Sequence, residues 1–158
     1  TASSGNISVN GTGFDSNRGA LNVNGGNFSA QNTVLEGTAG RNNKGTVLNG
    51  NINVTQGNLA VTGTVTQTAN SLDNNQFTGL LASGNITVSQ GSLNLTGHIT
   101  GNSGSNAKAV NLTNLNISAS NASITGINER NGTGFILSNV NLTGDIEKGA
   151  NTTFSSAG

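Results

Sequence analysis

Six acidic side chains and one histidine are the residues of this chain that could perform acid–base chemistry. Enzymes that cleave polysaccharides bring carboxylates together, or place calcium-binding acids beside a basic residue. Here the acids are spread thinly along the chain, and Asp145 and Glu147 come nearest to a pair. His98 has no serine, cysteine or metal-ligand partner near it in the sequence. We therefore predict no catalytic site, no metal site and no cofactor.

Twelve Asn-x-Ser/Thr sequons are the second chemical signal, because the asparagine amide of this tripeptide is where a glycosyltransferase attaches a sugar. In a strand such as Asn85-Ile86-Thr87, an inward isoleucine places the asparagine and the threonine together on the outer face. A chain rich in Asn, Ser and Thr also generates such tripeptides by composition alone. The candidates for glycosylation are Asn53, Asn85, Asn94, Asn111, Asn116 and Asn141.

A sequence repeat must position these residues. The segment GNINVTQGNLAVTGTVTQ (50–67) recurs 34 residues later as GNITVSQGSLNLTGHITG (84–101), with ten of 18 positions identical and no gap. Apolar residues fall at every second position, as a strand with one buried face requires. The apolar residues match in kind between the two copies: Ile52 with Ile86, Val54 with Val88, Leu59 with Leu93, Val61 with Leu95, and Val65 with Ile99.

The same pattern occurs in three further segments: 19–35, 109–127 and 134–146. The first of these aligns with 50–67 at an offset of 31, which places Leu21 opposite Ile52. About five strand-only units, spaced 24 to 34 residues apart, predict an all-β solenoid whose coils stack about 4.8 Å apart. Gly and Asn between the strands suit corners that need a positive φ, and Asn side chains can bond to Asn on the next coil. We therefore predict a single β-helix domain over residues 1–158.

The twelve charged residues are predicted to lie outside the regular strands, at one point in each coil. The longest insertion, residues 66–79, falls at the same point, so the loops of successive coils should stack at one corner. This loop surface is the natural place for a partner to bind, although charges and insertions also gather wherever a fold tolerates them. The predicted contact residues are Arg41, Lys44, Asp73, Phe77, Lys108, Glu129 and Arg130.

The units GNINV, GNLAV, GSLNLTG and GFILSNVNLTG resemble the filamentous-haemagglutinin type of exoprotein, a group of Gram-negative adhesins that includes the high-molecular-weight adhesins. The resemblance covers nearly the whole chain and implies a right-handed parallel β-helix, secreted by the two-partner route through an outer-membrane transporter and displayed at the bacterial surface. It also implies attachment to a receptor or glycan on host cells, or to other bacteria, and glycosylation at sequons. The family's secretion domain carries Asn-Pro motifs, and this chain has no proline. We therefore expect a segment of the shaft or binding region of a larger protein.

Composition argues against other classes of partner. With 8% charged residues and a net charge of zero, the chain lacks the basic surface of a nucleic-acid binder or of a protein that binds anionic membranes. No apolar run is long enough for insertion into a bilayer. One alternative to a non-enzymatic adhesin is a β-helix that binds or cleaves polysaccharides, with Asp73, Asp145 and Glu147 as its acids.

A second alternative is an ice-binding solenoid, which would need flat rows of outward threonines. Thr62, Thr64 and Thr66 form one such row, and Thr96 and Thr100 form part of the next. The fourth and fifth units are not expected to continue the array.

Overall fold

The structure, a computed structural model, describes residues 1–13, 19–40, 44–67, 77–101, 107–129, 133–143 and 151–157. Within these residues every regular element is a strand. The strands are β1 (Asn6–Gly13), β2 (Leu21–Ala39), β3 (Lys44–Gln67), β4 (Thr78–Gly101), β5 (Lys108–Asn128), β6 (Thr133–Thr143) and β7 (Asn151–Ala157). β2 to β5 have 19 to 24 residues, far beyond the usual 3–10, because each of them contains a whole coil.

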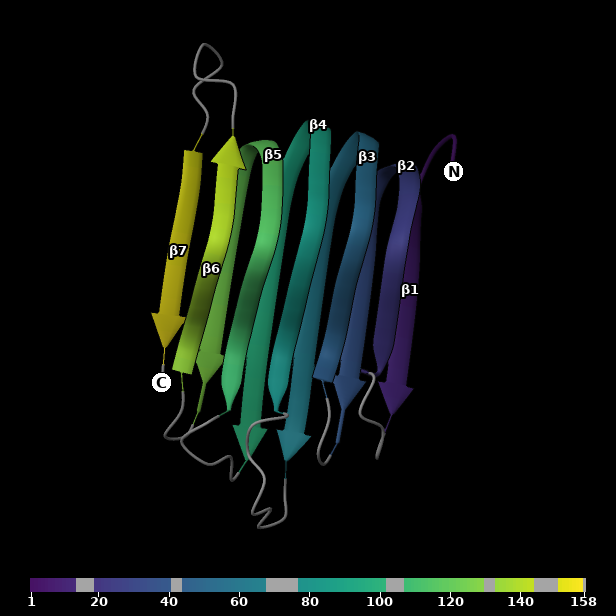
Figure 1. The fold of residues 1–158 in the computed structure, drawn as a ribbon. Helices are drawn as coiled ribbons and strands as arrows, with labels where there is room; N and C mark the ends of the chain where they lie inside the picture. The colour runs from purple at the N-terminus through teal and green to yellow at the C-terminus, as the bar shows by residue number, and fades with distance from the viewer. Residues whose placement is uncertain are drawn as a thin grey trace.

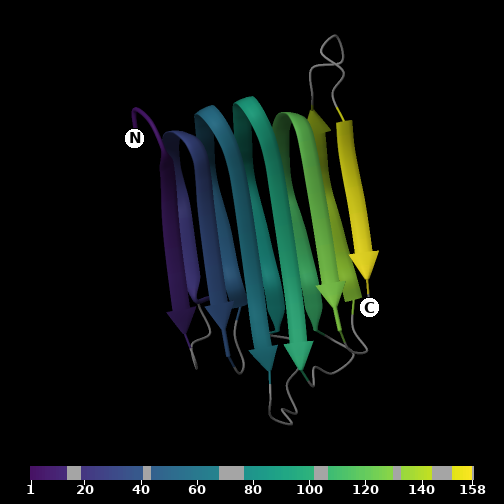
Figure 2. The ribbon, with the colours of Figure 1, turned by 180° about the vertical axis from the view of Figure 1, so that it is seen from behind.

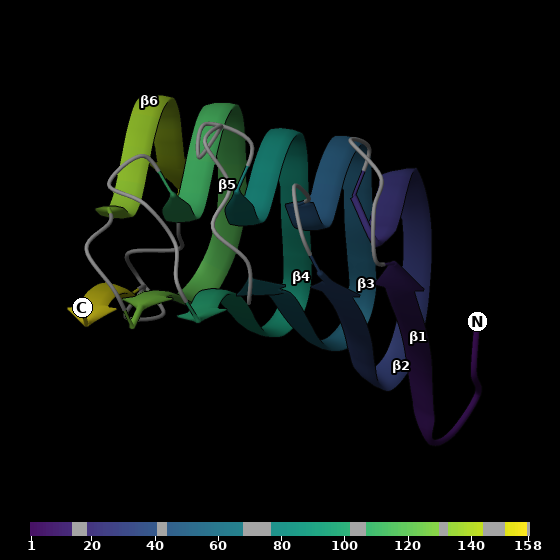
Figure 3. The same cartoon turned by 90° about the horizontal axis from the view of Figure 1, so that it is seen from below.

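All pairings between the described strands are parallel, in the order β1-β2-β3-β4-β5-β6, and β7 pairs with β5. The first halves of β2 to β5 form one layer with β6, and their second halves form the other layer with β1 and β7 (Figures 1 and 3). The view from behind shows each long strand bending over at the same end of the molecule (Figure 2). The chain is therefore a parallel β-solenoid, as the repeat predicted.

The core lies between the two layers and consists of columns of like residues. Ile52, Ile86 and Ile117 form one column, and all three are at least 98% buried. The inward residues alternate with outward polar ones, so each coil buries its apolar face only against its neighbours and the opposite layer. The five apolar pairs predicted between 50–67 and 84–101 are all confirmed by the register.

The first corner of each coil, and the second corner of β3 and of β4, are built on residues with positive φ. In β3 these are Gly50 and Gly57, with φ of 75° and 81°, and in β4 they are Gly84 and Gly91. The first corner of β5 uses a non-glycine residue instead, Asn114 at φ 48°. Such angles are cheap for glycine and tolerated by asparagine, so the predicted use of Gly and Asn at the corners is confirmed.

Hydrogen bonds between outward asparagines of successive coils form what we call the asparagine ladders. In every one, Nδ2 of the later coil donates to Oδ1 of the earlier coil, at 2.7 to 3.0 Å. The longest ladder contains four asparagines, one on each of four successive coils: Asn51, Asn85, Asn116 and Asn141. The bonds run from Asn32 to Asn6, Asn58 to Asn32, Asn53 to Asn27, Asn85 to Asn51, Asn116 to Asn85, Asn141 to Asn116, and Asn139 to Asn114. The predicted Asn-to-Asn bonding is thus confirmed.

A column of inward glycines in the second layer divides the core in two. At these positions the second layer touches the start of the next coil, so a Cβ on Gly63 would lie only 1.9 Å from the carbonyl oxygen of Gly79. The larger apolar cluster lies on the bend side of this column, and a smaller one around Phe77 lies on the loop side. The glycine column consists of Gly11, Gly37, Gly63, Gly97 and Gly126.

Two details of the sequence prediction are wrong. The alignment of 19–35 with 50–67 placed Leu21 opposite Ile52, but Leu21 lies opposite Thr46 and Gly26 lies opposite Ile52. Each coil contains several short segments of alternating apolar residues between corners, and these segments resemble one another. The alignment matched 19–35 to the wrong one of these segments in the next coil. The charged Glu36 consequently lies inside β2, on its outer face, and not in a loop.

Candidate functional site

The predicted loop surface lies at the end of the solenoid where β2 to β5 begin and end (Figure 1). Lys44 and Lys108 open β3 and β5 in one register column, and both side chains are half-buried. Glu129 follows β5 at the same end, and its side chain is exposed. The structure thus brings these three charged residues to one end of the molecule. The predicted contact residues Arg41, Asp73 and Arg130 lie outside the described residues.

Phe77 is a correction to the predicted loop surface. Its side chain is 0% exposed and packs in the smaller core cluster with Val65 and Ile99. The aromatic ring fills the space between the layers on the loop side of the glycine column, where the neighbouring core residues are small. Phe77 therefore stabilises this end of the fold and is not available to contact a partner.

Two of the predicted acids, Asp145 and Glu147, lie outside the described residues, in the connection between β6 and β7. β6 pairs with the first half of β5 and β7 pairs with its second half. This connection therefore interrupts one coil, whereas the other connections join one coil to the next. The prediction that all charges recur at one point of the coil is wrong for Glu36, which lies inside β2.

His98 lies on the outer face of β4, opposite Thr64, as the repeat predicted. Its Nε2 is 2.8 Å from Oε1 of Glu129 on the next coil, and both side chains are partly exposed. A histidine–carboxylate contact without a nucleophile has no catalytic use by itself. Within the described part of the chain, no group of three His, Cys, Asp or Glu side chains could hold a metal ion.

Outward threonines form two columns of three on the second layer, besides the pair of Thr66 and Thr100 that the array predicted. One contains Thr62, Thr96 and Thr125 on β3, β4 and β5, so the prediction that the fourth unit does not continue the array is wrong for Thr125. This column meets Glu36 on β2. The other contains Thr12, Thr38 and Thr64 and meets His98 on β4, so a charged or titratable residue interrupts each column.

The candidate glycosylation residues fall into two groups. Asn53, Asn85, Asn116 and Asn141 use Nδ2, the atom to which a sugar would be attached, to donate within the ladders. Asn94 is exposed between two small residues, Ala60 and Ser123, and its side chain makes no hydrogen bond with the described residues. Asn111 is half-buried between the larger Leu81 and Ile136. Of the six, Asn94 is thus the exposed one whose Nδ2 is not used in a ladder bond.

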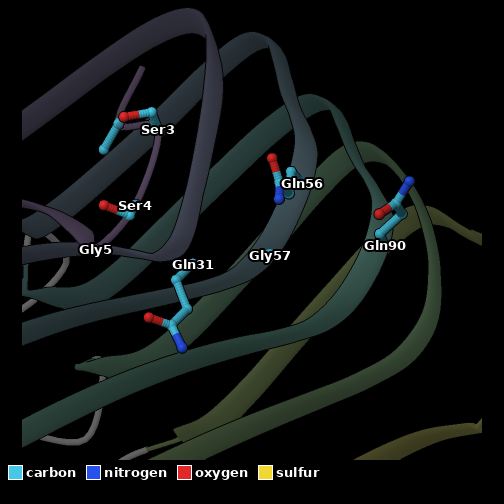
Figure 4. A pocket seen from close by; sticks show the side chains of 8 residues that line it. Ser3, Ser4, Gly5, Gln31, Gln56, Gly57 and Gln90 are labelled. Atoms are coloured by element: carbon cyan, nitrogen blue, oxygen red, sulfur yellow. The ribbon is translucent and has the colours of Figure 1, made fainter.

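A hollow of about 480 Å³ lies at the second corner of β2, β3 and β4. Three glutamines from three successive coils, Gln31, Gln56 and Gln90, line it together with the N-terminal segment (Figure 4). We call it the glutamine cleft. Its lining residues are Ala2, Ser3, Ser4, Gly5, Gln31, Gln56, Gly57 and Gln90.

The backbone at the corner holds the cleft in shape. Gly57 follows Gln56 with φ of 81°, and a Cβ there would lie 1.9 Å from the carbonyl oxygen of Ala30, so the coils are in direct contact. The backbone N–H of Gln31 donates to the carbonyl oxygen of Gly5 at 2.9 Å, and this bond fixes the N-terminal segment against β2. The glutamine side chains are exposed, so their amides are presented to solvent along the solenoid axis.

The lining contains no charged residue, and its side-chain amides and hydroxyls both donate and accept hydrogen bonds. Such a surface suits a neutral, polyhydroxylated ligand and offers nothing to neutralise an anion. The sequence prediction missed the cleft. The signal was the pair TQG and SQG, at 55–57 and 89–91, whereas Gln31 gives no such signal because Ser29, not Gln31, pairs with Gln56.

Comparison with known proteins identifies no relative. No protein-family model, no curated protein sequence and no solved structure matches the chain. Among the described residues, no helix has the length and apolar character needed to cross a membrane. The function is therefore argued from the surface of the solenoid.

Proposed function

We propose that this chain is a non-enzymatic adhesive segment of a secreted bacterial surface protein, and that its glutamine cleft binds neutral glycans of a host cell or another bacterium. The observation that carries the proposal is that Gln31, Gln56 and Gln90, from three successive coils, line one cleft without a charged residue. Gln56 and Gln90 lie at equivalent positions of neighbouring coils, about 4.8 Å apart, and Gln31 lies at the same corner of the preceding coil but outside their column, because Gln56 pairs with Ser29. A glycan chain laid along the solenoid would meet them one after another.

The expected affinity of one cleft is low. A net hydrogen bond contributes about 0.5–1.5 kcal/mol, so three amides supply roughly 1.5–4.5 kcal/mol. A dissociation constant of about 1 mM corresponds to roughly 4 kcal/mol. Firm attachment therefore requires many copies on one surface, which is how adhesive proteins displayed in large numbers gain avidity.

A polysaccharide-cleaving alternative is not favoured by the described carboxylates, which are Glu36 and Glu129. Glu36 lies in β2 and Glu129 follows β5, three coils further on. At about 4.8 Å per coil they are at least roughly 14 Å apart, beyond the separation of about 5–9.5 Å that glycoside hydrolysis uses. Asp73, Asp145 and Glu147 remain the acids on which a cleaving enzyme would depend.

The partners and location follow from the same proposal. Export through an outer-membrane transporter and display on the bacterial surface are supported by the resemblance of the repeat to filamentous-haemagglutinin-type adhesins. A host-cell receptor that is not a glycan would bind the charged end of the solenoid, which carries Lys44, Lys108 and Glu129, and not the cleft. The remaining predicted residues of that surface, Arg41, Asp73 and Arg130, lie outside the described residues.

A glycan array tests the proposal. The chain, displayed on beads to provide avidity, should retain neutral oligosaccharides, and the double variant Gln56→Ala/Gln90→Ala should lose most of that binding. The matched control is Asn22→Ala/Ser118→Ala, which removes two exposed polar side chains outside the cleft and should bind as the original chain does. Equal binding by the two double variants, or binding of acidic glycans only, would refute the proposal.

A second candidate function, ice binding, is favoured by the column of Thr62, Thr96 and Thr125. Thermal hysteresis of the chain would support it, and Thr96→Lys should abolish the effect. Glu36 and His98 interrupt the array, so we rank this function below glycan binding.

A further inference from the structure

Asparagine followed by glycine is the dipeptide that most readily loses its side-chain amide without an enzyme. Glycine has no side chain to keep its backbone nitrogen away from the asparagine carbonyl group, and its backbone adopts the required angles easily. The chain contains four such pairs, which begin at Asn10, Asn24, Asn49 and Asn131. Asn131 lies outside the described residues. The other three pairs occupy different environments, and these differ in what they offer to the reaction.

Asn49 stands at the first corner of β3 with the reacting groups already in contact. The backbone N–H of Gly50 donates to Oδ1 of Asn49 at 2.8 Å, so the nitrogen lies beside the carbonyl group that it would attack. Gly50 has a φ of 75° and takes no part in the register of β3 with β2 or with β4. The Asn49 side chain is exposed, which gives water access to the site.

Ser83 on the next coil supplies a second donor to the same carbonyl group. Its Oγ donates to Oδ1 of Asn49 at 3.1 Å. A hydrogen bond to this oxygen withdraws electron density from Cγ and stabilises the negative charge that develops on the oxygen when the nitrogen attacks. Nδ2 of Asn49, the leaving group, makes no hydrogen bond with the described residues, so its departure breaks none of their contacts.

The other two described pairs lack this combination. Asn10 and Gly11 lie inside β1 in register with β2, so the sheet holds their backbone extended. Asn24 occupies the same corner of β2 that Asn49 occupies in β3. Its Oδ1 points toward the next coil, where a Cβ on Gly50 would lie 2.9 Å away, and it accepts no hydrogen bond from the described residues. The same dipeptide is thus activated by its surroundings at Asn49 alone among the three.

We propose that Asn49 deamidates spontaneously in the folded chain, with Ser83 promoting the reaction. A base in the solvent takes the proton of the Gly50 nitrogen, and this nitrogen forms a bond to Cγ of Asn49. The bond between Cγ and Nδ2 then breaks, and ammonia leaves with a proton from the solvent. Water opens the resulting five-membered imide to give aspartate or isoaspartate at position 49. The chain, whose net charge is zero, thereby gains one negative charge. The inference does not depend on glycan binding.

The corner accommodates aspartate better than isoaspartate. Both hydrogen bonds of the Asn49 side chain are donated to Oδ1, and a carboxylate oxygen also accepts them. Isoaspartate instead adds a methylene group to the backbone at a point where successive coils are close, since a Cβ on Gly50 would lie 3.2 Å from the backbone nitrogen of Gly25. The folded chain should therefore yield a higher ratio of aspartate to isoaspartate than the denatured chain.

Peptide mass spectrometry of the chain, sampled over time at mildly alkaline pH, tests the proposal. A second sample is kept in denaturant, where sequence alone sets the rates. Dividing the folded rate at each site by the denatured rate removes the effect of sequence, and this quotient should be roughly tenfold higher, or more, for Asn49 than for Asn10 and Asn24. A quotient for Asn49 no higher than that for Asn24 would overturn the proposal. So would an unmodified Asn49 in the folded chain after the denatured chain has been converted.

Ser83→Ala tests the contribution of the second donor. It should slow the conversion of Asn49 roughly three- to tenfold, the effect of losing one hydrogen bond that the transition state keeps. The matched control is Ser92→Ala, which removes a serine that donates in the same way to Oδ1 of Asn58, an asparagine that leucine follows. This control should leave the rate at Asn49 unchanged. Circular dichroism checks that both variants are folded. Equal rates at Asn49 in the two variants would overturn the role assigned to Ser83.

Discussion

Gly97 touches the backbone of the next coil, so that a Cβ on it would lie 1.8 Å from the carbonyl oxygen of Ala109. Facing β-sheets normally pack about 10 Å apart because side chains fill the space between them. In this solenoid the layers are in backbone contact along the glycine column, and the core is divided into two clusters on either side of it. The glycines are needed for close approach, not for an unusual φ.

Gly97→Ala should therefore lower the free energy of unfolding. The added methyl group meets backbone, which cannot move away as a flexible side chain can, and overpacking typically costs about 1–3 kcal/mol. Gly13→Ala is the matched control, because its Cβ would lie 3.6 Å or more from any neighbour. Denaturant unfolding of both variants measures the difference. Equal stability of the two would contradict the close contact.

Thr33→Val should have the opposite effect and stabilise the fold. Thr33 is fully buried in a column between Ile7 and Leu59, and its Oγ1 has no hydrogen-bond partner in the described structure. Removing an unsatisfied buried hydroxyl should recover about 1–3 kcal/mol. In the control Thr46→Val, the lost hydroxyl donates to the carbonyl of Thr62 at 2.7 Å, so this variant should gain nothing. A decrease in melting temperature for Thr33→Val would count against the assigned column.

Asn85→Ala should destabilise the chain more than Asn141→Ala does. Asn85 lies inside the longest ladder and both donates to Asn51 and accepts from Asn116, whereas Asn141 makes the last bond only. At about 0.5–1.5 kcal/mol for each net bond, the loss at Asn85 should be about twice the loss at Asn141. Chemical denaturation resolves this ratio, and a ratio near one would argue against ladder bonding in solution.

Asn94 should be modified before Asn85 and Asn116 when the folded chain is given a sequon-specific glycosyltransferase. Asn94 is exposed beside small neighbours, while Nδ2 of each of the other two donates to an asparagine on the preceding coil. Mass spectrometry of peptides taken at successive times gives the order. Initial modification of Asn85 or Asn116 would show that the ladders do not protect the amide.

The best-conserved parts of the repeat within this chain were enough to predict most of the fold. The gap-free match of 50–67 with 84–101 gave the correct register of Ile52 on Ile86, because both coils have the same length. β2 is shorter, so its register needed a shift that the sequence alone did not specify. β1 was missed for a related reason, since eight residues supply half a coil and too little pattern.

The candidate site was harder to predict because the sequence search concentrated on charged and aromatic residues. Phe77 looked like an aromatic residue of a loop, but it fills the core at the narrow end of the solenoid. Gln31, Gln56 and Gln90 are neutral and looked like ordinary corner residues. They become a site only because the same corner of β2, β3 and β4 is brought together in the fold, where Gln31 lies beside Gly57 and next to the column of Gln56 and Gln90.

Retention on epithelial cells tests the central claim most directly. The chain and its variant Gln31→Ala/Gln56→Ala/Gln90→Ala are incubated with cells before and after enzymatic removal of surface glycans, and bound protein and released sugar are both measured. The account predicts saturable retention of the original chain, loss of most of it on deglycosylated cells and in the triple variant, and no released sugar. Equal retention of the triple variant, or release of cleaved sugar, would contradict it.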